Sequence, residues 1–375
     1  MKRYLYDQIV KDLKKKMVII TGPRQVGKTY LSKEIMKEFP SPQYLNHDNE
    51  NDRRIILQQS WRLNTGLLVF DEIHKMKNWK VFLKGTFDSR LEGQTILVTG
   101  SARLETYRQA GESLAGRYLH LRLLPFSVKE LSNDLAPFDA LEKLNSFGGF
   151  PEPFLSDSEE EASRWRNQYY SDLIREDIFD FSRIQELKAM KELVELLRYR
   201  VGSSMSYTSL AEDLQISPNT VKKYISVLES LYIIFLIRPY HKNIARSILR
   251  EPKVYFYDSG FVRGNEGVRL ENTCALCLLK HVHYLYDVRG KHAELNYIRT
   301  KEGKEIDFVI VMEGAPHKLI EVKLSDKTPA RAMHYFAGQF KNTQSIQLVH
   351  HLHQEEHLAG IDILRAGDWL AGLEA

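Results

Sequence analysis

The sequence is poor in cysteine: Cys274 and Cys277 are the only two in 375 residues. A framework of disulfides is therefore excluded, and the pair has no second pair of ligands with which to form a zinc site. We expect both cysteines to be buried on one face of a helix. Such low cysteine use is typical of proteins from a reducing compartment, which predicts a cytoplasmic location.

Long apolar runs are also missing. No stretch reaches the roughly 18 apolar residues of a membrane span, and Met1-Lys2-Arg3 is not followed by a signal-peptide core. Charge of one sign is scarce too, because the formal net charge is only +4. That balance permits nucleic-acid binding without requiring it. A hydrophobic content of 43% is sufficient for globular cores, and the length predicts about two to three domains.

A complete phosphate-binding motif is present near the N-terminus. The pattern G-x-x-x-x-G-K-[ST] is matched by Gly22, Pro23, Arg24, Gln25, Val26, Gly27, Lys28 and Thr29. An apolar strand precedes it and a helix follows, which is the context that the motif requires. Loop N–H groups and the helix N-terminus would cradle phosphates, Lys28 would reach the β and γ oxygens, and Thr29 would hold Mg²⁺.

Two further strands are expected to complete this site. "GLLVFDEIHKM" is an apolar strand that ends in Asp71, which would orient Mg²⁺ through water, and Glu72, which would polarise the attacking water. "QTILVTGSA" supplies Thr99 or Ser101 as a sensor of the γ-phosphate. Arg117 is a candidate arginine sensor or finger, acting in the same chain or on a neighbouring subunit of a homo-oligomer; the alternative is an ordinary surface arginine.

Several runs of this chain resemble a family of bacterial and archaeal AAA-like ATPases whose C-terminal region is poorly characterised. They are YLNHDNENDR, LLVFDEIHK, LVTGSARL, SLAGRYLHLRLLPFSVKEL and GGFPEP. The resemblance covers nearly the whole chain and implies ATP as the nucleotide, with an AAA-like α/β parallel sheet and a helical lid. We expect the ATPase domain at residues 1–126 and a helical lid or connector at 127–186.

The next segment predicts a winged helix-turn-helix at residues 187–250. Ser217 would cap a second helix that starts at Pro218, with an apolar stripe formed by Val221, Tyr224, Ile225 and Leu228. In such a fold the second helix can enter the major groove of DNA. Its candidate nucleic-acid contacts are Asn219, Thr220, Lys222 and Lys223, followed by His241, Lys242, Arg246 and Arg250. Winged helices also serve as protein-interaction modules, and that alternative stays open.

Residues 251–375 carry a second acidic pattern. Asp307 lies on one predicted strand of a hairpin, and Glu321 and Lys323 share a face of the next strand because they are two positions apart. With Glu271 on a preceding helix, this order resembles the PD-(D/E)xK nuclease fold. That resemblance assigns metal binding to Asp307 and Glu321, an auxiliary carboxylate role to Glu271, and positioning of the hydrolytic water to Lys323. Alternating charges on a half-exposed strand are the structural alternative.

The run "HHLHQEEH" contains His350, His351, His353 and His357. Its spacing matches no strong metal motif, so an exposed polar run is expected. Two hypotheses for the whole chain follow. The first is an ATPase that acts on DNA and carries a nuclease-like site. The second is a nucleotide-dependent binding switch with a vestigial site, which holds DNA or protein partners without cleavage.

Overall fold

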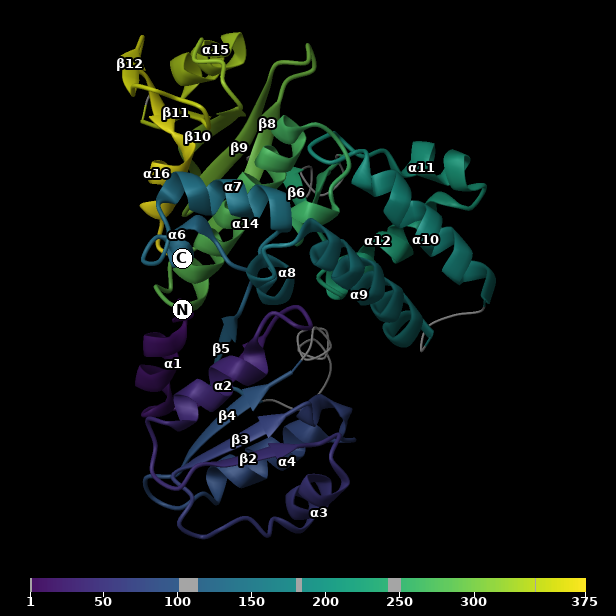
Figure 1. Ribbon diagram of the computed structural model, residues 1–375, viewed down its shortest axis with the longest axis vertical. Helices are drawn as coiled ribbons and strands as arrows, with labels where there is room; N and C mark the ends of the chain where they lie inside the picture. Colours follow the sequence, from purple (N-terminus) through teal and green to yellow (C-terminus); the bar gives the residue numbers. More distant parts are fainter. Residues whose placement is uncertain (1, 101–113, 180–183, 242–250, 341) are drawn as a thin grey trace. The chain divides into compact units, whose positions relative to one another are not determined.

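The computed structural model describes residues 2–100, 114–179, 184–241, 251–340 and 342–375. They form two compact units, residues 1–124 and 125–375 (Figure 1). Both units mix helices with a sheet, so the predicted α/β class is confirmed. No helix in the described ranges combines the length and the apolar character needed to cross a membrane.

Unit 1 is built on a five-stranded sheet in the order β2-β3-β4-β1-β5, in which every pairing is parallel. The strands are β1 (Met17–Thr21), β2 (Gln43–Asn46), β3 (Leu67–Asp71), β4 (Thr95–Thr99) and β5 (Tyr118–Arg122). The helices are α1 (Tyr6–Leu13), α2 (Lys28–Met36), α3 (Glu50–Gln58), the 3-10 turn η1 (Ile73–Lys75) and α4 (Trp79–Asp88). Because both faces of a parallel sheet are covered, β1 and β3 are buried at every position.

Alternate residues of these strands form one hydrophobic core. Phe70 of β3 packs with Ile56 of α3 and with Trp79 and Leu83 of α4. Leu31 and Ile35 of α2 are buried outside this cluster, and Figure 1 shows α2 across the other face of the sheet. Because β1, β3 and β4 are parallel, their carboxyl ends lie at one edge of the sheet, which is where parallel α/β sheets place their ligand sites.

Unit 2 contains an eight-stranded mixed sheet in the order β12-β13-β11-β10-β9-β8-β6-β7. Its strands are β6 (Ile234–Pro239), β7 (Lys253–Phe256), β8 (Ala293–Arg299), β9 (Glu305–Met312), β10 (Ala315–Lys323), β11 (Gln344–Val349), β12 (Glu356–Leu358) and β13 (Ile361–Arg365). The predicted hairpin is confirmed, since β8 and β9 pair antiparallel across the turn at 300–304. β10 pairs antiparallel with β9 and parallel with β11.

The helices of unit 2 come before, between and after the strands of this sheet in sequence. They are α6 (Val128–Leu131), α7 (Pro137–Phe147), α8 (Pro151–Leu155), α9 (Glu159–Phe179), α10 (Ile184–Arg198), α11 (Tyr207–Leu214), α12 (Pro218–Ser230), α14 (Glu266–Asp287), α15 (Arg331–Gln339) and α16 (Ala366–Ala371), with the 3-10 turn η3 (Ser259–Phe261). Cys274 and Cys277 are free and buried on α14, as predicted.

The sheet crosses the predicted domain boundary at residue 250, because β6 pairs with β7 on one side and with β8 on the other. Strands on both sides of that boundary thus share one sheet. The division into four parts at residues 126, 186 and 250 otherwise stays a prediction.

Candidate functional site

The phosphate-binding motif folds as a tight loop between β1 and α2. Gly22 has φ +147°, and a Cβ at that position would lie 2.1 Å from the carbonyl oxygen of Leu123. Gly27 adopts a left-handed conformation, φ 96°, immediately before α2 begins at Lys28. Only glycine accepts the close approach at residue 22, and it tolerates the positive φ at both positions. The two glycines therefore allow the tight loop that leads into the N-terminus of α2, where backbone N–H groups can bind an anion.

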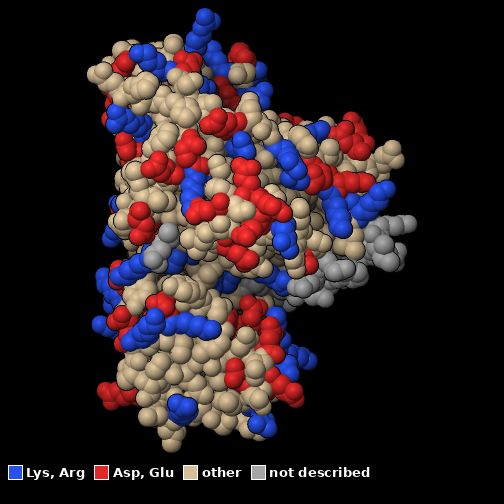
Figure 2. Space-filling view, viewed as in Figure 1, with Lys and Arg blue, Asp and Glu red and all other residues tan. Residues whose placement is uncertain are grey.

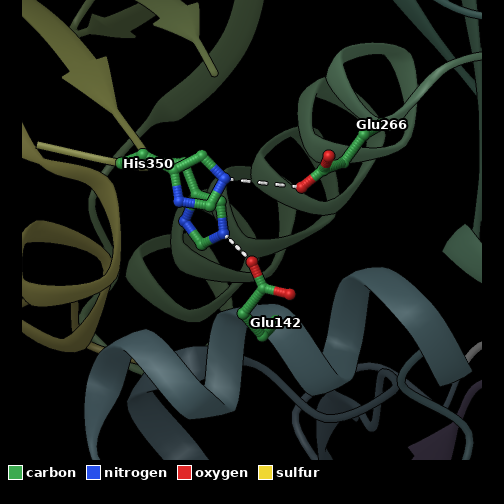
Figure 3. Close-up of side chains that lie close together, drawn as sticks. Glu142, Glu266 and His350 are labelled. Carbon is green, nitrogen blue, oxygen red and sulfur yellow. Dashed lines mark hydrogen bonds and ion pairs between the residues drawn. The ribbon is translucent and has the colours of Figure 1, made fainter. Parts of the chain in front are cut away.

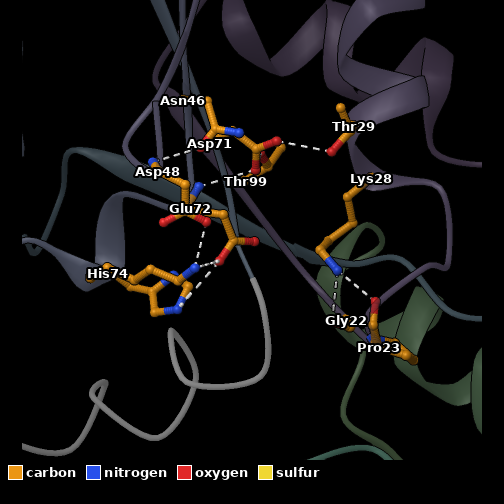
Figure 4. A network of polar contacts seen from close by, with 11 residues as sticks. Gly22, Pro23, Lys28, Thr29, Asn46, Asp48, Asp71, Glu72, His74 and Thr99 are labelled. Carbon is orange, nitrogen blue, oxygen red and sulfur yellow. Dashed lines mark hydrogen bonds and ion pairs between the residues drawn. The ribbon is translucent and has the colours of Figure 1, made fainter. Parts of the chain in front are cut away.

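Asp71 is the centre of the polar network at the carboxyl edge of the sheet (Figure 4). Its Oδ2 accepts a hydrogen bond from Thr29 Oγ1 at 2.9 Å, and its Oδ1 accepts one from Thr99 Oγ1 at 2.5 Å. Lys28 Nζ donates to the carbonyl oxygens of Gly22, at 3.0 Å, and Pro23. β4 lies between β1 and β3, so Thr99 is placed between the phosphate loop and Asp71.

Glu72 begins the turn after β3 in a left-handed conformation, φ 55°. Its backbone N–H donates to Asp71 Oδ1 at 3.1 Å, and its carboxylate lies 3.7 Å from both His74 Nε2 and Lys75 Nζ. Lys75 also pairs with Asp48 Oδ2 at 2.5 Å. The carboxylate of Glu72 is thus oriented from one side by cationic and imidazole groups.

Burial sets the proton affinities of this site. It lowers the pKa of Lys28 to about 8, although Glu72 and Asp71 act in the opposite direction. It raises the pKa of Glu72, and the charge of Asp71 raises it further. A carboxylate of raised proton affinity is better suited to accept a proton from water. Thr29 Oγ1 and the Asp71 carboxylate are hard oxygen donors, and they fit a Mg²⁺ ion between them and bound phosphates.

Two side chains of this site were missed by the sequence analysis. Tyr44 of β2 donates its hydroxyl to Asp71 Oδ2 at 2.5 Å. Arg3 is buried and donates Nη1 to the carbonyl oxygen of Val26 at 2.5 Å and Nη2 to that of Leu124 at 2.6 Å. Arg3 thereby supports the loop from behind. Neither residue belongs to a motif, because both reach the site through tertiary contacts.

The structure does not bring Arg117 to the phosphate loop. Its guanidinium pairs with Asp88 at 2.8 Å, and its carbonyl oxygen accepts from the N–H of Met17, the first residue of β1. Since the phosphate loop follows the last residue of β1, Arg117 lies at the opposite edge of the sheet. These contacts agree with the alternative of an ordinary surface arginine, and a role as sensor or finger stays a prediction. Ser101 lies outside the described residues, as do Lys242, Arg246 and Arg250.

The four residues of the predicted nuclease-like pattern gather in unit 2. Asp307 Oδ2 accepts from the N–H of Val322 at 3.0 Å, which ties β9 to β10 beside Glu321. Lys323 Nζ lies 2.7 Å from Glu321 Oε1. Glu271 extends from α14 and accepts a hydrogen bond from Tyr255 OH at 2.7 Å. Burial and the charge of Asp307 raise the pKa values of Glu271 and Glu321 to about 7 each.

Lys253 is a component of this cluster that sequence reasoning missed. Its side chain is 2% exposed, and its Nζ lies 2.7 Å from Glu305 Oε1, 3.7 Å from Glu271 Oε1 and 3.8 Å from Asp307 Oδ1. The carboxylates raise the pKa of Lys253 against the opposing effect of burial. Lys253 is therefore a built-in counter-ion for the acidic side chains. No local pattern marks it, because it lies on β7, far in sequence from β9.

The cluster nevertheless contains the type of oxygen ligand that a divalent cation prefers. Glu321 Oε2 is buried and has no hydrogen-bond partner among the described residues. Carboxylates also outnumber cations, even when the exposed Arg299 beside Glu305 is included. The carboxylates are Glu271, Glu305, Asp307 and Glu321, and the ammonium groups are those of Lys253 and Lys323. Carboxylate oxygens are ligands that Mg²⁺ and Mn²⁺ prefer.

The helix pair α11 and α12 follows the predicted cap and stripe. Ser217 accepts a hydrogen bond from Thr220 N at 3.1 Å and caps α12, which has Pro218 at its first position. The four predicted apolar residues, Val221, Tyr224, Ile225 and Leu228, are buried. Asn219, Lys222 and Lys223 are exposed, and Thr220 is half-buried. On the face drawn in Figure 2, basic and acidic side chains are interspersed.

Three family profiles match parts of the chain. Residues 14–132 match a family described as "AAA domain", and residues 138–269 and 266–366 match two families described as "domain of unknown function". Two uncharacterised proteins, one of Mycobacterium tuberculosis and one of Methanocaldococcus jannaschii, are 26% and 27% identical to this chain over the aligned residues. The alignments cover 84% and 85% of this chain and 72% and 80% of those proteins.

Two solved structures of RuvB variants from Thermotoga maritima align with TM-scores of 0.28 and 0.29 at 16% and 15% identity. They cover 61% and 62% of this chain and 86% and 88% of the RuvB chains. TM-scores of this size carry no argument about the fold. The match to the AAA family and the geometry of the phosphate loop show instead that residues 14–132 are an AAA-like P-loop domain, the type of domain that binds a nucleotide.

Proposed function

We propose that this chain is a Mg²⁺-dependent ATPase that acts on DNA and cleaves it at the acidic cluster of unit 2. The hydrolysis of ATP is supported by the network around Asp71. In this proposal Lys28 binds the β- and γ-phosphates, Thr29 and Asp71 hold Mg²⁺, and Glu72 accepts the proton of the attacking water. Thr99 is hydrogen-bonded to Asp71, and in this proposal it senses the γ-phosphate.

The observation that carries the proposal of cleavage is the convergence of Glu271, Asp307, Glu321 and Lys323 from one helix and two strands. A metal ion bound there would polarise the phosphodiester and generate hydroxide from water. The protein supplies the rest: Asp307 and Glu321 bind the ion, Glu271 assists, and Lys323 positions the water. Burial of the cluster strengthens these interactions.

DNA is the expected substrate because of α11 and α12. Gln215 ends α11 in a left-handed conformation, φ 54°, and Ser217 caps α12 two residues later. This turn leaves Asn219, Lys222 and Lys223 on the exposed side of α12, where polar side chains can meet base edges and phosphates. The antiparallel pair β6–β7 follows, as the strands of a winged helix-turn-helix would.

Asp307→Ala should abolish metal-dependent cleavage. With Mg²⁺ or Mn²⁺ we expect the wild type to nick plasmid or cut single-stranded DNA, and the variant to lose activity by at least about 100-fold.

Wild-type cleavage should also rise as the pH increases through about 7, because Glu271 and Glu321 bind a metal ion only when deprotonated. Gel assays with and without ATP would measure both effects.

Glu294→Ala is the matched control, since Glu294 is an exposed carboxylate on the neighbouring strand β8. It should cleave as the wild type does. Equal cleavage by Asp307→Ala would assign the activity to a contaminant or another site. A wild type that cuts neither DNA under any condition, while it still hydrolyses ATP, would rule out the cleavage half of the proposal only.

Reversal of charge on α12 tests the DNA contact. The double substitution Lys222→Glu and Lys223→Glu should weaken DNA binding and reduce the slope of log K against log salt by about two, because two phosphate contacts are lost. Fluorescence anisotropy at several salt concentrations measures both quantities. Lys188→Glu, which alters an exposed lysine of α10, is the control. An unchanged slope in the double variant would leave DNA binding to another element.

A second candidate function is favoured by Lys253. Its ammonium group already supplies one positive charge to Glu271, Glu305 and Asp307. In this alternative the cluster is structural, and ATP controls the binding of DNA or a protein partner without cleavage. Lys253→Met separates the candidates: a structural cluster would lose stability, whereas a metal site would bind Mn²⁺ more tightly once the competing cation is removed.

A further inference from the structure

Two histidines and two glutamates meet in unit 2 outside the acidic cluster (Figure 3). Glu142 comes from α7, Glu266 is the first residue of α14, and His350 and His351 follow β11. One ligand atom of each residue lies within 4.8 Å of the corresponding atom of all the others. His350 Nε2 contacts Glu142 Oε1, and His351 Nε2 lies 3.6 Å from Glu266 Oε1.

These side chains are held in place by their surroundings. The N–H groups of His350 and His351 donate to the carbonyl oxygens of Lys323 and Leu324 at 3.1 and 2.8 Å. The imidazole of His350 stacks on the ring of Phe138, with the centroids 4.8 Å apart. Phe138 lies one helical turn before Glu142 on the same face of α7. The backbone and α7 together therefore fix the direction of the buried imidazole.

Hydrogen bonds alone leave this arrangement incomplete. His350 is 2% exposed and its Nε2 contacts Glu142, whereas His351 Nε2 lies 3.6 Å from Glu266 Oε1, beyond hydrogen-bond distance. Two carboxylates also face the two imidazoles, and none of these four side chains carries a permanent positive charge. A divalent cation would balance the charge of the carboxylates and draw the four ligand atoms together.

We propose that Glu142, Glu266, His350 and His351 bind a single Zn²⁺ ion. Two imidazole nitrogens and two carboxylate oxygens form a four-coordinate set suited to zinc, with metal–ligand distances of about 2.0–2.2 Å. Mg²⁺ and Ca²⁺ are disfavoured because they prefer more oxygen ligands. Glu142 and Glu266 are half-buried and His351 is exposed, so an ion can enter from solvent.

The ion would join three segments that are distant in sequence. α7, α14 and the end of β11 would be cross-linked at one point, and His350 is bonded through its backbone to Lys323 of the acidic cluster. Glu266 lies five residues before Glu271 on α14, about 7.5 Å along the helix axis. The zinc site would thus be a structural site that stabilises unit 2 next to the acidic cluster, and it does not depend on the function proposed above.

The test is titration of the metal-free full-length protein with Zn²⁺ against a chromophoric chelator. We expect one tight equivalent and a rise in melting temperature, because an ion that binds only the folded state stabilises it. X-ray absorption at the zinc edge should show two imidazoles. The double variant His351→Ala, Glu266→Gln changes only exposed or half-buried groups, and should weaken binding at least about 100-fold and remove the thermal shift.

His353→Ala is the matched control, because His353 is an exposed histidine of the same segment and should bind Zn²⁺ as the wild type does. Asp307→Asn should also leave this equivalent unchanged, which separates it from metal bound at the acidic cluster. The absence of a tight equivalent in the wild type would overturn the proposal. Equal affinity in the wild type and the double variant, or an absorption spectrum without imidazole, would overturn it too.

Discussion

Glu72→Gln is expected to lower the rate of ATP hydrolysis by about 10²- to 10⁴-fold while ATP binding persists, the range that general base catalysis contributes. The substitution removes the proton acceptor but keeps the size of the side chain and the backbone hydrogen bond to Asp71. Burial and Asp71 raise the pKa of Glu72, so wild-type turnover should fall as the pH decreases through that raised value. Phosphate release and nucleotide titration measure the two quantities.

Two comparisons decide the role of Glu72. Lys75→Met removes the ion pairs of Lys75 with Asp48 and Glu72 but leaves the carboxylate, so it should retain most of the turnover. Lys28→Ala should lose ATP binding itself, since Lys28 is the ammonium group of the phosphate loop. If Glu72→Gln lost binding as Lys28→Ala does, Glu72 would be structural. Unchanged turnover would remove it from the mechanism.

Glu130→Ala is expected to reduce the free energy of unfolding by about 3–5 kcal/mol, the usual cost when one partner of a buried ion pair is removed. Lys280 Nζ lies 2.6 Å from Glu130 Oε2, and both side chains are 1% exposed. The ammonium group also donates to the carbonyl oxygen of Pro125 at 2.9 Å, but that bond does not neutralise its charge. Urea denaturation of the full chain measures the loss.

The matched control is Glu192→Ala, which breaks an ion pair with Lys188 on the surface of α10. Its effect should be under about 1 kcal/mol, because exposed ion pairs contribute little. The double variant Glu130→Leu, Lys280→Met should recover most of the loss, since an apolar pair carries no desolvation cost. Similar stability of Glu130→Ala and Glu192→Ala would contradict the burial of the pair.

Local patterns predicted the parts of this fold that depend on neighbouring residues. The phosphate loop is a contiguous motif, and the apolar stripe of α12 follows from helical periodicity alone. The pairing of β8 with β9 follows from a short turn between two apolar strands. Glu321 and Lys323 were found because two residues of one strand necessarily share a face.

Contacts between segments that are distant in the sequence could not be predicted from local patterns. His350 was expected to be exposed, yet it is buried against Glu142, 208 residues away in sequence. His351, His353 and His357 are exposed as predicted. Lys253 and Arg3 were missed for the same reason, because burial and pairing across the fold decide their roles. The pairing of Arg117 with Asp88 is likewise a contact between distant residues that its local sequence does not indicate.

The position of β6 restricts the motion of unit 2. This strand follows α12 after three residues and is hydrogen-bonded to β7 on one side and to β8 on the other. A hinge needs a segment whose backbone bonds are free to reorganise, and β6 does not provide one. β7, which pairs with β6, carries Lys253, so the helix pair and the acidic cluster are attached to one sheet.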